Sequence, residues 1–579
     1  MRDTLYQTRQ KKRGILAIAG LILGITVLSG FTMHGTMSLD PSVKFKVTRS
    51  VVDHGDVKFR LTEEEQSYDN HYTMAGVTGP DGNFYTGYHG IGQVLLFAGP
   101  YYLYHHVLGI ESEKLIRSLI ALTLFPLQLA LIGWIGYLLL REFDFSPRQS
   151  YLAAVLLIFA TGLWEMAREA QDGIHVAFLF ALCGYGLRRY QKTAHWRWLV
   201  LTGLSIGFAF ITRSDTAPSV LVVLGFAAWL IHRHNRYTFP HRTWSMRALP
   251  YLLLPALTLP FLCVEIFYNL HRFGHPVMSY SRSFDWEIFL IGFKGLLYSP
   301  GKGLFWYNPL LLLAIPGFIY LYRRYREWAV AIFLGFAGCF LLHASVTEFH
   351  GNICWGPRYL LRYLPLLFIP VAFFLFSDSM RNILVRLVVG LVIAVSALVQ
   401  VAAVSLHYER ELDEMAVAYG YWSAKQWTMF EPEAHILERR LANLYMAVDD
   451  MRHGRIPPWP EKELVTGTAE KNLQAPVLRY LAFWPYHMTY YLPTVRPELA
   501  QPLWVSTCVL LGGVSLGLLI LRLGWGLCPP VSSLAEPERA RPKRSVLGTG
   551  PVFIPRLGFI ENVGMRPAVK SAGRRKVGI

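Results

Sequence analysis

Long apolar runs separated by short clusters of basic residues recur along most of the chain. The first run, Ile15 to Phe31, follows a basic cluster and has no small-residue cleavage site, which is typical of a signal anchor. Eleven further apolar runs predict helices at 115–140, 149–167, 173–188, 197–213, 216–232, 249–268, 303–322, 328–345, 359–377, 382–405 and 502–522. Because a helix needs about 20 predominantly apolar residues to cross the hydrocarbon core, the pattern predicts an all-α polytopic membrane protein with about twelve transmembrane helices.

One further apolar segment, residues 91–107, is ambiguous, and the distribution of Lys and Arg decides its place. If it stays outside the membrane, twenty Lys and Arg residues fall in short segments on the cytoplasmic side and three on the other, namely Arg168, Arg213 and Arg358. Counting it as a span reverses every later element and puts the basic clusters on the wrong side. We therefore predict that 91–107 is an interfacial helix and that both termini are cytoplasmic.

This topology divides the chain into a transmembrane core over 1–405 and three later segments. The core contains large outer segments at about 32–114, which holds juxtamembrane helices and the expected catalytic region, and at 269–302. Residues 406–501 form a third outer segment with helical stretches at 409–418 and 434–451 and the aromatic cluster FWPYHMTYY, expected at the membrane surface. Residues 502–522 are the last span, and 523–579 are a basic tail that is expected to be disordered.

Composition supports a membrane protein and excludes other classes. Hydrophobic residues make up 53% of the 579 residues, and charged residues only 16%, against about 25% in a typical globular domain. The formal charge of +17 comes from the clusters between apolar runs, so we expect no nucleic-acid partner. Six cysteines form no CxxC pair, and no disulfide or zinc site is predicted. The lack of an internal repeat disfavours an inverted-repeat transporter.

Ionisable groups near membrane depth are costly and therefore suggest function. Asp40 follows the first span, in GTMSLDPSVKF. Asp at an N-cap followed by Pro41 is an ordinary helix start. The alternative is a general base, since partial desolvation raises the pKa of a carboxyl group. Asp172, in the loop REAQD, is either a ligand-binding carboxylate or a solvated residue that pairs with Arg168 across one turn.

Further along the chain, cationic residues stand at the ends of the predicted helices. A lipid phosphate requires such donors, and Arg offers bidentate contact. The alternative for each is snorkelling toward lipid headgroups. The residues are Arg213 in ITRSDTAPS, Lys302 in SPGKGLFWYNP, and Arg358 with Arg362 in GPRYLLRYLP.

These motifs, in this order, resemble the membrane-embedded C-type-fold glycosyltransferases that use polyprenyl-phosphate sugars, a group that includes protein O-mannosyltransferases and lipid A aminoarabinose transferases. The family has an Asp-Glu at the end of its first helix, then a basic or small position and a Gly-Asp. Asp40, Arg49, Gly55 and Asp56 keep that pattern, although Pro41 replaces the Glu. The segment NFYTGYHG, with Tyr88 and His89, resembles the family's proline-rich turn but lacks its prolines. The two longer cationic motifs, SPGKGLFWYNP and GPRYLLRYLP, also resemble family signatures.

The resemblance implies transfer of a sugar from a polyprenyl-phosphate donor to a lipid, glycan or protein acceptor, at the periplasmic or extracellular face of the cell (inner) membrane. It implies Asp40 as catalytic base, the four cationic residues at the donor phosphate, and Asp56, Tyr88, His89 and Asp172 at the sugar or acceptor. No cofactor is predicted, although Asp40, Asp53, Asp56 and Asp69 could assemble a divalent-ion site. Two alternatives stay open: a transporter or flippase of lipid-linked saccharide, and a surface-glycan polymerase or ligase.

Overall fold

The structure is a computed structural model, and a single compact unit covers Met1–Val531. It describes residues 2–35, 37–61, 76–87, 90–237, 244–276, 285–347, 349–351, 354–419, 436–455, 473–474, 476–486 and 502–529. Helices cover each of the twelve predicted spans. They are α1 (Arg2–Phe31), α6 (Glu113–Glu142), α7 (Pro147–Phe159) with α8 (Leu163–Arg168), α9 (Gly173–Thr193), α10 (Arg197–Thr212), α11 (Ala217–Tyr237), α12 (Trp244–Phe273), α15 (Ala314–Arg324), α16 (Arg326–Ala344), α18 (Leu364–Leu375), α19 (Ile383–Ser405) and α26 (Leu503–Leu527).

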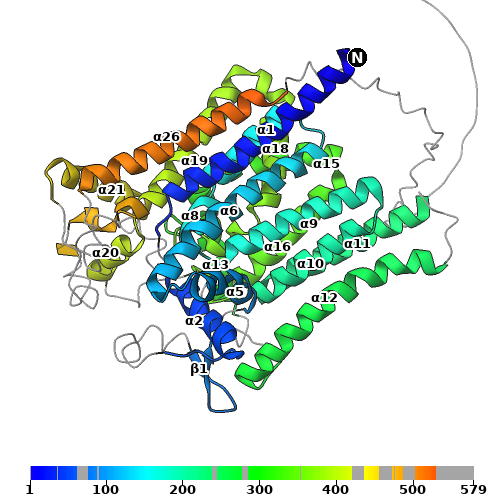
Figure 1. Ribbon diagram of the computed structural model, residues 1–579. Coiled ribbons are helices and arrows are strands. Elements are labelled where there is room, and N and C mark those ends of the chain that lie inside the picture. Colours follow the sequence, from blue (N-terminus) through cyan, green and yellow to red (C-terminus); the bar gives the residue numbers. More distant parts are fainter. Residues whose placement is uncertain are drawn as a thin grey trace, which may run out of the picture. The chain divides into compact units, whose positions relative to one another are not determined.

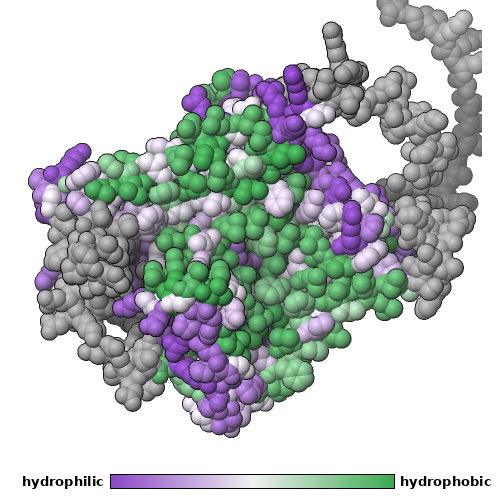
Figure 2. All heavy atoms as spheres, viewed as in Figure 1, coloured by the Kyte–Doolittle hydropathy of each residue, from purple (hydrophilic) through white to green (hydrophobic). Residues whose placement is uncertain are grey.

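Seven of the helices in the described part of the chain are long and apolar enough to cross a membrane. They are Thr8–Phe31, Glu113–Glu142, Ser214–Arg236, Arg247–Phe273, Arg326–Ala344, Ile383–Ser405 and Leu503–Leu527. Figure 2 shows hydrophobic residues in a broad band over the long helices, with hydrophilic residues gathered toward their ends. The all-α membrane architecture is thus confirmed. The number of twelve spans and the cytoplasmic position of the termini stay predictions.

One predicted span, 149–167, is interrupted between α7 and α8. The interruption frees backbone groups, which must find other partners inside a protein. The amide of Gly162 donates to the Asn308 side-chain oxygen at 2.8 Å, so a residue 146 positions away satisfies it. The predicted span therefore consists of two helices, α7 and α8, and a tertiary hydrogen bond stabilises the break between them.

Glycines allow the first and last long helices to pack closely. α1 and α26 run side by side in Figure 1. A Cβ atom on Gly20 would lie 2.9 Å from the Cα atom of Gly524, a distance that real Cβ atoms do not tolerate. Small residues at such contacts let helix backbones approach, which is the usual basis of helix packing in membranes. α26 thus returns to the core after the long segment that follows α19.

Shorter elements gather at one end of the bundle, where α1 finishes and α6 begins, which we call the α2 end (Figure 1). They are α2 (Leu39–His54), the antiparallel pair β1 (Gly76–Thr78) and β2 (Phe84–Thr86), α5 (Gly92–Tyr102), α13 (Trp286–Tyr298), α14 (Leu304–Tyr307), α17 (Arg358–Leu361), α20 (Glu409–Tyr419) and α21 (Ile436–Arg452). α20 and α21 confirm the two helical stretches expected after 406. From the aromatic cluster, Trp484 donates from its indole nitrogen to the Gly30 carbonyl, at the end of α1.

The ambiguous segment 91–107 forms α5 and a following π-helical turn, Leu103–Val107. It packs against α2 and is absent from the span-length helices of the described chain. Tyr102, Leu103 and Val107 are exposed. These features suit a helix at the membrane interface, where amphipathic aromatic rings are favoured.

Candidate functional site

Helix α2 does not begin with Asp40 as its N-cap. Ser38, and not Asp40, is the N-cap of α2, and Ser38 donates its hydroxyl to the Glu169 carbonyl at 2.9 Å. Asp40 instead lies in the first turn of the helix. The N-cap interpretation of Asp40 is therefore wrong, because the helix begins two residues earlier and the Asp40 carboxylate has another partner.

That partner is Arg358, at the start of α17. Its Nη1 atom donates to Asp40 Oδ2 at 3.0 Å. The Asp40 side chain is 33% exposed and the Arg358 side chain 17%. An arginine is therefore held beside a carboxylate that is about one third exposed.

Asp172 lies deeper, between two cations. Lys44, one turn after Asp40 on α2, places its Nζ 2.5 Å from Asp172 Oδ2. Arg213, at the end of α10, donates to Asp172 Oδ1 at 3.2 Å. The alternative of a pair between Arg168 and Asp172 is wrong, since Arg168 pairs with Glu169 instead. Burial of Asp172 favours these pairs, because a buried carboxylate requires a cation nearby.

A second carboxylate, Asp215, holds Arg213 and Arg362. Arg213 pairs with it at 2.8 Å and Arg362 at 2.5 Å, and Arg362 also contacts His343 at 2.9 Å. The Arg362 side chain is only 1% exposed. Arg362 is thus part of the buried frame behind the site.

The Tyr359 ring connects the Asp40–Arg358 pair to the residues around Asp172 and Asp215. Arg213 and Arg358 lie over the ring at 5.1 and 5.2 Å from its centre, and His343 stacks on it at 4.5 Å. Cations over an aromatic face are attracted by its quadrupole. The result is one network with four cations (Lys44, Arg213, Arg358, Arg362) and three carboxylates (Asp40, Asp172, Asp215).

Lys302 lies buried in the turn before α14. Its ammonium group donates to the Cys354 carbonyl and lies 3.3 Å from the Cys354 sulfur. The Tyr408 ring faces it at 5.0 Å. Burial lowers the pKa of Lys302 below its ordinary value. Lys302 therefore anchors the loop that contains Cys354 and ends at Arg358.

The remaining predicted residues divide into two cases. Asp56 stands apart from the network and forms a bidentate pair with Arg60 at 2.6 and 2.7 Å, whose hydrogen bonds lower the pKa of the Asp56 carboxyl. Tyr88 and His89 lie outside the described residues. The next residue, Gly90, touches the end of α10, where an added Cβ atom would lie 2.4 Å from the Ile211 carbonyl oxygen. Gly90 thus lies against the end of α10, next in the chain to Arg213.

Three of the four carboxylates considered for a divalent ion have separate partners. Asp40 pairs with Arg358, Asp56 with Arg60, and Asp53 with His106 at 2.9 Å. Asp69 lies outside the described residues.

Sequence reasoning missed Lys44, Asp215, His343 and Tyr359. One signal was available: Lys44 follows Asp40 by four residues, which places both on the same face of a helix. Asp215 follows Arg213 by two residues in the same turn, and that spacing suggested nothing about its second partner, Arg362. Chemically, the network offers cationic donors for a phosphate beside the partly exposed carboxylate of Asp40, which can accept a proton.

Comparison with known proteins gives one family match. Residues 114–261 match the family model described as dolichyl-phosphate-mannose-protein mannosyltransferase, which confirms the resemblance over that segment. Asp172 and Arg213 fall inside it. None of the curated proteins matches the chain.

Two solved structures are similar at 14% sequence identity. One is ArnT from Cupriavidus metallidurans bound to undecaprenyl phosphate, with a TM-score of 0.40, covering 84% of this chain and 89% of that one. The other is the apo state of the same protein, with a TM-score of 0.42, covering 85% and 90%.

Proposed function

We propose that the protein transfers a sugar from a polyprenyl-phosphate donor to an acceptor hydroxyl at the outer face of the membrane. The observation that carries this proposal is the Asp40–Arg358 pair, a partly exposed carboxylate beside an arginine within a network richer in cations than in carboxylates. A donor of this kind has a lipid tail, which suits a bundle of apolar helices, and a phosphate, which suits the arginines at their ends.

In this proposal Arg358 and Arg213 bind the donor phosphate, because they are the more exposed arginines of the network. Asp40 deprotonates the acceptor hydroxyl as that oxygen attacks the anomeric carbon, and the bond to the phosphate oxygen breaks. The two arginines stabilise the charge that develops on the leaving phosphate. Lys44 holds Asp172 in place, so that its carboxylate can accept hydrogen bonds from sugar hydroxyls.

Two observations support an enzyme of this class over a transporter. The network lies at helix ends, whereas transporters place their polar groups near the middle of the membrane on broken helices. The family model over 114–261 describes a mannosyltransferase that uses dolichyl-phosphate mannose.

The test is an assay of the purified full-length chain with a panel of polyprenyl-phosphate sugars. The readout is release of the free lipid phosphate. A membrane extract supplies the acceptor, so the assay does not require its identity. Sugar-dependent release supports the proposal. Movement of intact lipid-linked saccharide across vesicles, without release, would replace it with the flippase alternative.

A further inference from the structure

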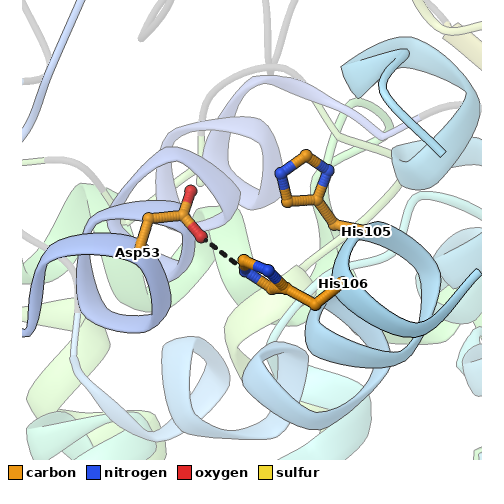
Figure 3. Close-up of side chains that lie close together, drawn as sticks. All are labelled: Asp53, His105 and His106. Atoms are coloured by element: carbon orange, nitrogen blue, oxygen red, sulfur yellow. Dashed lines mark hydrogen bonds and ion pairs between the residues drawn. The ribbon is translucent and has the colours of Figure 1, made fainter. Parts of the chain in front are cut away.

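Two adjacent histidines that follow α5 face the last turns of α2 (Figure 3). The Nε2 atom of His106 lies 2.9 Å from Oδ1 of Asp53, and His105 lies beside them. One potential ligand atom from each of the three residues lies within 4.8 Å of the others. Among the residues that the structure describes, no other three His, Cys, Asp or Glu side chains meet this criterion.

The backbone departs from regular helix geometry where the histidines stand. Both belong to the π-helical turn Leu103–Val107. Successive side chains of a regular α-helix point about 100° apart, so two neighbours rarely serve one ligand. π-helical turns inside helices are rare and occur frequently at functional sites. Here the turn leaves the two imidazole rings 4.8 Å apart, both close to α2.

Hydrogen bonds orient two of the three side chains. The Nδ1 atom of His105 lies 2.9 Å from the Ile110 carbonyl oxygen, which assigns the proton to Nδ1 and leaves the Nε2 lone pair free. The Tyr101 hydroxyl donates to Asp53 Oδ2 at 2.8 Å and leaves Oδ1 toward His106. Metal-binding histidines and carboxylates are characteristically held by such bonds through their other atom.

We propose that Asp53, His105 and His106 bind a divalent transition-metal ion, and zinc is the ion their chemistry fits best. Two imidazoles and one carboxylate suit zinc, whereas calcium and magnesium prefer oxygen ligands alone. Tetrahedral zinc bonds of about 2.0–2.1 Å place ligand atoms about 3.3 Å apart, so binding draws the cluster together by about 1.5 Å. Asp53 and His106 are exposed, which gives them room to move and leaves a fourth position for water or an anionic group.

This metal site is separate from the candidate functional site. Asp53 follows Asp40 by 13 residues on α2, which at the rise of an α-helix is about 20 Å. The inference therefore stands without the proposed function. Its consequence is mechanical, because the ion ties the end of α2, the helix that carries Asp40 and Lys44, to the end of α5.

The experiment uses the full-length chain, free of any affinity tag, purified in detergent and stripped with a chelator. Zinc is then titrated calorimetrically, and bound zinc is counted by mass spectrometry after dialysis. We expect one ion per chain. The variants Asp53→Asn, His105→Gln and His106→Gln should each weaken binding at least about tenfold, and Tyr101→Phe by roughly 10–100-fold through lost orientation of Asp53. The matched control is His54→Gln, an exposed histidine beside Asp53, which should bind zinc as the unaltered chain does.

Two results would overturn the inference. Unaltered zinc affinity in the three ligand variants would place any bound ion elsewhere. If the unaltered chain does not bind zinc at micromolar concentration, the cluster is no metal site, and Asp53 and His106 only form a hydrogen bond. Asp53 and His106 are exposed, His105 is partly exposed, and Tyr101→Phe removes only a hydroxyl group from a buried ring. Elution by gel filtration and thermal unfolding of each variant should therefore match the unaltered chain without metal, which separates lost binding from lost folding.

Discussion

The guanidinium group of Arg358 lies 3.0 Å from the carboxylate of Asp40, although 318 positions separate them in the chain. The contact brings α2 and α17 together, and it gives the proposed base a neighbour that can also reach a donor phosphate. The pair is partly exposed to solvent, and screening limits the contribution of such a pair to stability. The pair therefore matters chiefly because it offers a guanidinium group and a carboxylate to a ligand.

Replacing Arg358 tests this interpretation. Arg358→Ala should weaken binding of a polyprenyl-phosphate donor by about 1.5–3 kcal/mol, the range for a hydrogen bond to a charged group. Arg358→Lys should restore part of the loss, since lysine keeps the charge without the fork geometry. Donor affinity is measured by competition with a labelled lipid phosphate. Arg60→Ala, which breaks an arginine–aspartate pair outside the network, is the control, and equal affinity in all three variants would make Arg358 a structural residue.

Lys44 provides a prediction about stability. Its side chain is 1% exposed, and its removal leaves the Asp172 carboxylate with less compensation. Lys44→Met should therefore destabilise the fold by about 1–3 kcal/mol, seen as a lower temperature of unfolding in detergent. The double variant Lys44→Met with Asp172→Leu should cost less than the sum of the two single changes, because it removes both charges. Additive losses would show that the two side chains do not interact.

His407 predicts a pH dependence. Burial alone would lower the pKa of His407, but the Glu409 and Glu169 carboxylates raise it above its ordinary value. Since the folded-state pKa is raised, the protonated histidine contributes stability that is fully present below about pH 6.5. That contribution is lost as the pH rises through the folded-state pKa. In thermal unfolding between pH 5.5 and 8.5, His407→Gln should reduce the loss of stability on the alkaline side. A profile for His407→Gln identical to that of the unaltered chain would refute the prediction.

The membrane topology predicts the location of three connections. Reporter fusions after Phe145, after residue 240 and after Met380 should all report the cytoplasm, because the basic clusters lie there. The fusions also test the interfacial position of 91–107, since an additional span would reverse every later connection. A non-cytoplasmic signal at any of the three positions contradicts this topology.

Much of the helical layout could be predicted from the sequence, because runs of apolar residues at membrane length have few other structures available. The gap between α7 and α8 could not, since it depends on Asn308 from a distant turn. The sequence predicted several residues of the candidate site but not the contacts between them. Asp40, Asp172, Arg213 and Arg358 meet at the α2 end, as the motifs suggested.

The contacts themselves depend on how helices pack, which periodicity does not determine. Nothing in the chain near Asp172 indicates that its closest cation is Lys44, 128 positions away. Arg362 stands on the same short motif as Arg358, yet it turns inward to Asp215. Which of two neighbouring arginines faces a ligand and which supports the frame is decided by tertiary structure alone.

The most direct test of the proposed function is the turnover of Asp40→Asn. The asparagine keeps the shape of the side chain and an oxygen that accepts from Arg358, while Ser38 remains the N-cap, so folding and donor binding should persist. If Asp40 is the general base, turnover should fall by about 10²–10⁴. Asp56→Asn, the matched carboxylate outside the network, should retain most of the activity. Full turnover in Asp40→Asn, or its loss in Asp56→Asn alone, would contradict the assignment of the base to Asp40.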